Sequence, residues 1–135
     1  MHELVSLLAS GLIIGFILFQ VCLNTPIIFT KLSPENASPV LRTIFPRFFL
    51  SIFLFSFISF LLLYINNVRG LVVNVSIATI ILSGICYLII PATNNARDEN
   101  NDSLFSFYHN VSVFSTLIIL VINIISFFSY QVIFN

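Results

Sequence analysis

The sequence predicts an all-α integral membrane protein in which four helices cross the bilayer, with a short interfacial helix between the first and the second. Hydrophobic residues make up 59% of its 135 residues and charged residues only 7%, whereas an ordinary soluble domain contains about 25% charged residues. Four apolar runs of roughly 18 residues or more carry no Asp, Glu, Lys or Arg, and each is long enough as a helix to cross about 30 Å of hydrocarbon. Because these runs are uniformly apolar rather than alternating, helices are favoured over a β-barrel.

The expected spans cover about residues 4–29, 46–66, 70–91 and 104–133, so that residues 1–135 form a single domain. The first span follows Met1-His2-Glu3 and lacks the preceding basic residue that is typical of a signal peptide. After this span, Ser33-Pro34 and Ser38-Pro39 are typical helix starts. They predict the interfacial helix, which ends where Phe45-Pro46 turns the chain into the second span.

The distribution of basic residues predicts the orientation of the chain in the membrane. Lys31, Arg42 and Arg47 lie in the first connection or at its edge, Arg97 lies in the third connection, and only Arg69 lies in the second. By the positive-inside rule, we expect the first and third connections in the cytoplasm and both termini outside a bacterial inner membrane. The five basic and five acidic residues cancel, which excludes a nucleic-acid-binding protein.

Polar residues recur at helical spacing within the spans and predict a bundle with a mildly polar seam. The fourth span carries His109, Ser112, Thr116, Asn123, Ser126 and Tyr130, the third carries Ser76, Thr79, Ser83 and Cys86, and the first carries Ser6, Ser10, Gln20 and Asn24. Polar side chains in lipid prefer partners on neighbouring helices. These residues therefore either join the helices by hydrogen bonds or line a ligand cavity or solute path, for which Gln20 and Asn123 are candidates.

Apart from Arg47 at the start of the second span, the spans contain no ionised side chain, which argues against a proton-coupled pump. The sequence also lacks paired buried acids, a phosphate-binding glycine loop and a His-Glu-x-x-His pair. We therefore favour a non-enzymatic protein, and the sequence requires no cofactor. Cys22, Cys86 and His109 lie near the same ends of their spans and are a candidate copper or zinc site, and His109 alone is a candidate haem ligand. The alternative is that the thiols are ordinary apolar core residues.

Gly11 and Gly15 form a small-xxx-small pair that allows two helices to approach closely, either within the chain or in a homo-oligomer. The expected partners of this chain are the lipid bilayer and either another membrane protein or a second copy of the chain. The leading functional prediction is an accessory or binding protein that acts through helix–helix contacts. The alternatives are a metal- or haem-handling protein that uses His109 and a small-solute path along the polar seam.

Several motifs in their order along the chain resemble the transmembrane protein 205-like family, also described as domain of unknown function 4149. They are Gly11 to Gly15, Asn24-Thr25-Pro26-Ile27-Ile28-Phe29, Leu41-Arg42-Thr43-Ile44-Phe45-Pro46-Arg47-Phe48, 91–97 and Phe107-Tyr108-His109-Asn110-Val111-Ser112. The resemblance implies a small four-span membrane protein without an established activity. It also implies that Pro26, Arg47, Asn95, Arg97 and His109 are positions to test as a ligand site. The family pattern has an Asn seven residues after the His, where this chain has Thr116.

Overall fold

A computed structural model describes the backbone of residues 2–133 and the side chains of residues 4–129. Its elements are α1 (His2–Leu18), a π-helix (Phe19–Asn24), α2 (Thr25–Lys31), α3 (Pro34–Ile65), α4 (Leu71–Asp98) and α5 (Asp102–Ile133). Four helical segments are long and apolar enough to cross a membrane: Leu4–Lys31, Pro34–Ile65, Leu71–Asp98 and Asp102–Ser129. The predicted all-α fold with four membrane-spanning helices is confirmed.

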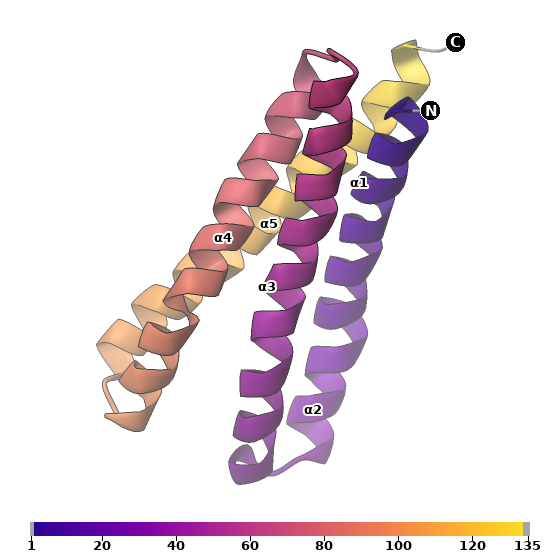
Figure 1. The fold of residues 1–135 in the computed structure, drawn as a ribbon. Coiled ribbons are helices and arrows are strands. Elements are labelled where there is room, and N and C mark those ends of the chain that lie inside the picture. Colours follow the sequence, from indigo (N-terminus) through magenta and orange to yellow (C-terminus); the bar gives the residue numbers. More distant parts are fainter. Residues whose placement is uncertain (1, 134–135) are drawn as a thin grey trace.

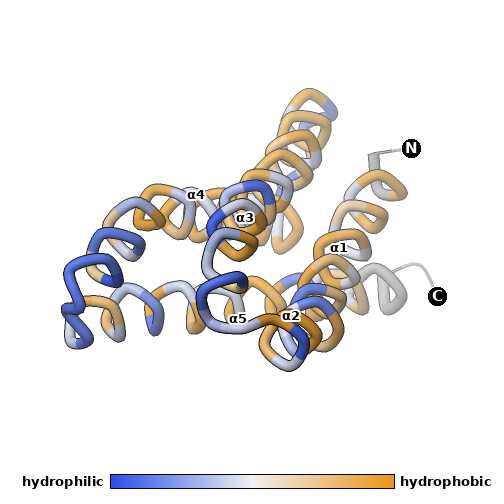
Figure 2. The backbone as a smooth tube through the Cα atoms, turned by 90° about the horizontal axis from the view of Figure 1, so that it is seen from below, coloured by the Kyte–Doolittle hydropathy of each residue, from blue (hydrophilic) through white to orange (hydrophobic). Residues whose placement is uncertain are grey.

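The four long helical segments pack side by side in the order α1, α3, α4, α5, and α5 returns to contact α1. Consecutive segments run in opposite directions, so that the first turns of α1 and the last turns of α5 lie at the same end (Figure 1). At the opposite end, the tip where α4 joins α5 diverges from α2 (Figures 1 and 2). Hydrophilic residues gather at that tip and at the connection between α2 and α3, as Figure 2 shows.

One apolar cluster lies between the helices, and α1, α3, α4 and α5 all contribute side chains to it. It consists of Ile13, Ile17, Phe48, Phe49, Ile52, Cys86 and Ile119. Aromatic contacts extend it, since the Phe16 ring stacks on Phe48 at 5.5 Å between ring centroids. Lipid tails are as apolar as these side chains, so close van der Waals packing rather than exclusion of water stabilises this core.

The expected interfacial helix is not a separate element, because residues 34–45 are the first turns of α3. Pro39 and Pro46 both lie inside this continuous helix. A proline fixes φ at a helical value and removes one backbone hydrogen bond, which neighbouring helices can compensate. Here α2 packs against α3, and Ala37 in the first turns is only 3% exposed. The buried contact at Ala37 therefore helps to hold the first turns of α3 in place.

Candidate functional site

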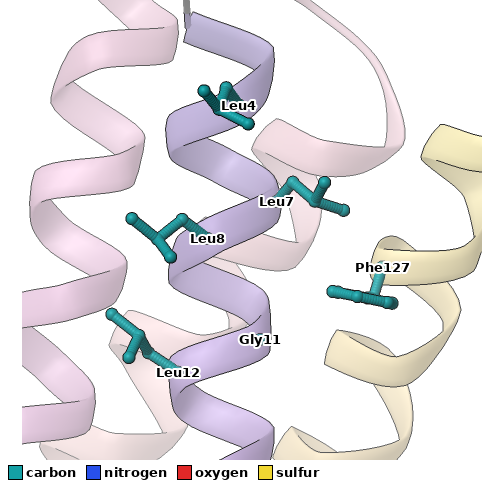
Figure 3. Close-up of a pocket in the computed structure, with 6 residues that line it drawn as sticks. All are labelled: Leu4, Leu7, Leu8, Gly11, Leu12 and Phe127. Carbon is teal, nitrogen blue, oxygen red and sulfur yellow. The ribbon is translucent and has the colours of Figure 1, made fainter.

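A shallow apolar groove lies on the outer side of α1, where α1 meets α5 (Figure 3). It encloses about 260 Å³ and is lined by Leu4, Leu7, Leu8, Gly11, Leu12 and Phe127. Its lining is almost entirely carbon, and Leu4, Leu8 and Leu12 are exposed. In a membrane, the groove is therefore a surface for a lipid tail or for another apolar helix.

The two glycines predicted as one helix-packing pair have different surroundings. A Cβ added at Gly11 would lie 3.3 Å from Cε2 of Phe127, so the missing side chain lets α5 approach α1. A Cβ added at Gly15 would meet no atom within 4 Å, and Gly15 is exposed. Gly11 thus belongs to a contact within the chain, whereas Gly15 leaves a notch on the outer face of α1.

Gln20 lies in the π-helix, where it forms a small amide cluster with residues of its own segment. Its side chain is 6% exposed. Its Nε2 donates a hydrogen bond to Thr25 Oγ1 at 3.2 Å, and its Oε1 accepts one from Asn24 Nδ2 at 2.8 Å. A π-helix widens the turn and is often found at functional positions. In this chain the widened turn places three polar side chains within reach of one another.

Asn123 forms part of the contact between α4 and α5, away from Gln20. The side chain is 2% exposed. Its Nδ2 donates to Thr79 Oγ1 at 3.0 Å and to the Ile119 carbonyl at 2.8 Å. On the neighbouring interface, Ser56 of α3 donates to the Ser76 carbonyl of α4 at 2.9 Å. Polar side chains of the seam therefore join adjacent helices.

An ion pair and an aromatic stack connect the helix ends near the α4–α5 tip. Arg42 of α3 forms a two-point contact with the Asp98 carboxylate at the end of α4, in which Nη1 donates to Oδ2 at 3.0 Å. Arg42 and Asp98 both lie outside the expected membrane crossings at 46–66 and 70–91. The hydrogen bond from this guanidinium, together with its charge, lowers the pKa of Asp98, and the same contact raises the pKa of Arg42. Both side chains are solvent-exposed enough to be screened by salt.

Arg97 and His109 meet at a third residue, Phe105. The Arg97 guanidinium carbon lies 4.2 Å from the Phe105 ring centroid. The His109 ring stacks on the same ring at 5.7 Å between centroids, with an angle of 9° between the planes. The structure thus brings together two of the residues singled out from the sequence. Phe105 itself was missed there, although its spacing of four residues from His109 is the helical signal that could have identified it.

The remaining predicted ligand residues lie apart from this stack. Arg47 is exposed on α3, Asn95 is exposed on α4, and Pro26 is exposed on α2. Gln20 and Asn123 belong to the two hydrogen-bonded groups described above. The seven predicted ligand residues are therefore distributed over several parts of the chain.

The three residues of the candidate metal site also have different environments. Cys22 is exposed and Cys86 is buried, while His109 is exposed beside Phe105. Among the residues that the structure describes, no group of three His, Cys, Asp or Glu side chains could hold a metal ion. Cys22, Cys86 and His109 are thus not gathered around one point.

Comparison with known families agrees with this architecture. A family model described as a domain of unknown function (DUF4149) matches residues 8–102. The chain belongs to this family. No curated protein and no solved structure matches it. In this DUF4149 protein the matched region includes Gly11, Gly15, Arg47 and Arg97, whereas His109 and Asn123 follow it. The match supports the domain of unknown function suggested by the motifs and leaves the transmembrane protein 205-like name untested.

Proposed function

We propose that this DUF4149 protein is a non-enzymatic accessory protein that binds other transmembrane helices along the outer face of α1. The observation that carries the proposal is the open notch at Gly15 beside the apolar groove. Two helices in lipid associate when their backbones approach closely, because apolar side chains gain little by leaving apolar lipid. Gly15 offers such an approach, and Leu8 and Leu12 form exposed walls beside it.

The polar seam supports this proposal better than it supports a solute path. Asn123 and Ser56 use their hydrogen bonds to join neighbouring helices. The apolar cluster around Ile13, Phe49 and Ile119 occupies the interior between all four long segments. A solute on the bundle axis would have to displace these packed side chains.

The proposal includes an orientation, in which the α2–α3 and α4–α5 connections face the cytoplasm of a bacterial cell and the termini face out. Four of the five basic residues lie at those two connections or in the helix turns beside them. This bias is the signal that sets orientation in inner-membrane proteins. With that orientation, α1 presents Leu8 and Gly15 to the outer half of the bilayer.

The test is site-specific photo-crosslinking in living cells, with the crosslinking amino acid at Leu12 beside the notch. We expect an adduct with a second copy or with another membrane protein, identified by mass spectrometry. Gly15→Ile should abolish the adduct, since a Cβ at this position meets no atom within 4 Å and the larger side chain occupies the notch. The crosslinker at Ile118, an exposed position on α5, is the control and should give no adduct.

Gly11→Ile separates folding from binding. Its side chain would press on Phe127, so this substitution should destabilise the chain itself. Gly15→Ile should leave the thermal unfolding midpoint unchanged. The proposal is wrong if the Leu12 adduct persists in Gly15→Ile, or if Leu12 yields no adduct in cells that contain the folded protein.

A further inference from the structure

We propose that Arg97 and His109, both held against the Phe105 ring, bind the phosphate group of a phospholipid at the α4–α5 end of the protein. This site is separate from the groove on α1 and does not depend on it. It uses residues of α4 and α5 alone.

The Phe105 ring fixes the two polar groups and leaves their donors free. A guanidinium over an aromatic face is attracted by the electrons of the ring, and the N–H groups of the guanidinium point outward from the edge of its own plane. The imidazole of His109 stacks almost parallel on Phe105, so its ring nitrogens also lie at an edge. Both side chains are exposed. Guanidinium and imidazole donors that lie against the same ring are suited to phosphate oxygens.

Neighbouring acids do not neutralise Arg97 in the described part of the chain. The carboxylate of Asp98, next in sequence, is bonded to Arg42 instead. Glu99 and Asp102 are exposed, and the described residues show no ion pair between either of them and Arg97. Asp102 begins α5, seven residues before His109, which corresponds to about 10 Å along the helix and to about one Debye length at 0.1 M salt.

Apolar side chains around the stack indicate that the phosphate belongs to a lipid. Val113 is 48% exposed and Leu117 is 53% exposed. They follow His109 by four and eight residues, further into the fourth span, and Val113 is on the same face of α5 as His109. Tyr108, next to His109, has the amphipathic ring that is enriched at the level where lipid headgroups meet the acyl chains. A phospholipid would place its phosphate against Arg97 and His109 and its tails against Val113 and Leu117, further into the span.

Native mass spectrometry of the protein released from nanodiscs of phosphatidylglycerol and phosphatidylethanolamine tests the proposal. The wild type should retain phospholipid, and Arg97→Gln should retain about tenfold less, because a charge-assisted hydrogen bond is lost. Phe105→Leu should also lower retention although it removes no charge. Arg47→Gln is the matched control, since Arg47 is an exposed arginine on α3 outside this stack. Circular dichroism verifies that each variant is folded.

A competition arm distinguishes the two sources of phosphate. If millimolar inorganic phosphate leaves the lipid in place, the ligand is the lipid, as proposed. If inorganic phosphate displaces the lipid in the wild type but not in Arg97→Gln, the phosphate chemistry stands and a free phosphate compound is the ligand. Equal retention by the wild type, Arg97→Gln and Phe105→Leu overturns the proposal, as does an equal loss in Arg47→Gln.

Discussion

At the scale of single residues, the polar side chains inside the membrane illustrate how hydroxyl and amide groups are satisfied without water. Many bond to a carbonyl of their own helix, as Thr116 does with Ser112 at 2.7 Å. Asn123 does this with Ile119 and also reaches across to Thr79 on α4. An unpaired amide in hydrocarbon costs roughly several kcal/mol, so the two hydrogen bonds that Asn123 donates are favourable.

Thr79→Val should therefore lower the free energy of unfolding by about 1 kcal/mol, since it removes the acceptor on α4 with almost no change of volume. Thr116→Val is the matched control, because its hydroxyl bonds only within α5. It should change the free energy of unfolding by no more than about 0.5 kcal/mol. Reversible unfolding by SDS in bicelles measures both values. A cost for Thr79→Val no larger than that for Thr116→Val would contradict this account of the seam.

The residue scale also shows where sequence reasoning reached its limit. The pattern identified Gly11 and Gly15, but only the packing of Phe127, more than a hundred positions away, distinguishes an internal contact from an open notch. Arg97 and His109 were each singled out, yet their common contact with Phe105 depends on how α4 and α5 pack. These residues could be singled out from the sequence, whereas the residues that they contact could not, because the packing of the helices determines those contacts.

At the scale of elements, the four apolar segments could be read directly from the sequence, since the bilayer imposes a minimum helix length. The structure of the connection between the first two segments could not be read from the sequence in this way. Prolines 39 and 46 indicate missing backbone hydrogen bonds, but whether the helix continues depends on its neighbours. The π-helix at Phe19–Asn24 was also not foreseen, because one widened turn leaves hydropathy unchanged.

The contact between Arg42 and Asp98 joins the ends of α3 and α4 and makes their association sensitive to acid. The pKa of Asp98 in the folded protein is lowered, below its ordinary value of 3.8. Its stabilising contribution is present above the unfolded-state pKa and is lost as the pH falls from about 4 through the folded-state value. The raised pKa of Arg42 has no effect in this range, because its guanidinium stays charged throughout.

Asp98→Asn should accordingly lower the thermal unfolding midpoint at pH 7. It should also reduce the additional decrease of the midpoint between pH 5 and pH 3, since part of that decrease in the wild type comes from protonation of Asp98. Glu99→Gln removes a neighbouring exposed carboxylate that has no ion pair in the described chain. Circular dichroism of the protein in detergent at several pH values gives the midpoints. Equal pH profiles for the two variants would show that the ion pair contributes nothing.

At the scale of the whole molecule, the arrangement separates three environments. Apolar side chains such as Leu88 and Phe128 cover the outer surface, hydrogen-bonded serines and Asn123 lie inside, and the charged residues gather mainly at the α2–α3 and α4–α5 connections. Our interpretation depends on this separation. The groove on α1 meets other helices only if lipid surrounds it, and the stack on Phe105 meets phosphate only if the α4–α5 tip lies at a membrane surface.

The most direct test of this arrangement is cysteine labelling in intact cells, in a background with Cys22→Ser and Cys86→Ser. Asn66→Cys places a thiol at the α3–α4 connection, and Ser103→Cys places one at the start of α5. A membrane-impermeant maleimide should label Asn66→Cys from outside and should reach Ser103→Cys only after the membrane is permeabilised. Labelling of both positions from the same side would contradict the four crossings, and labelling of Ser103→Cys alone from outside would contradict the proposed orientation.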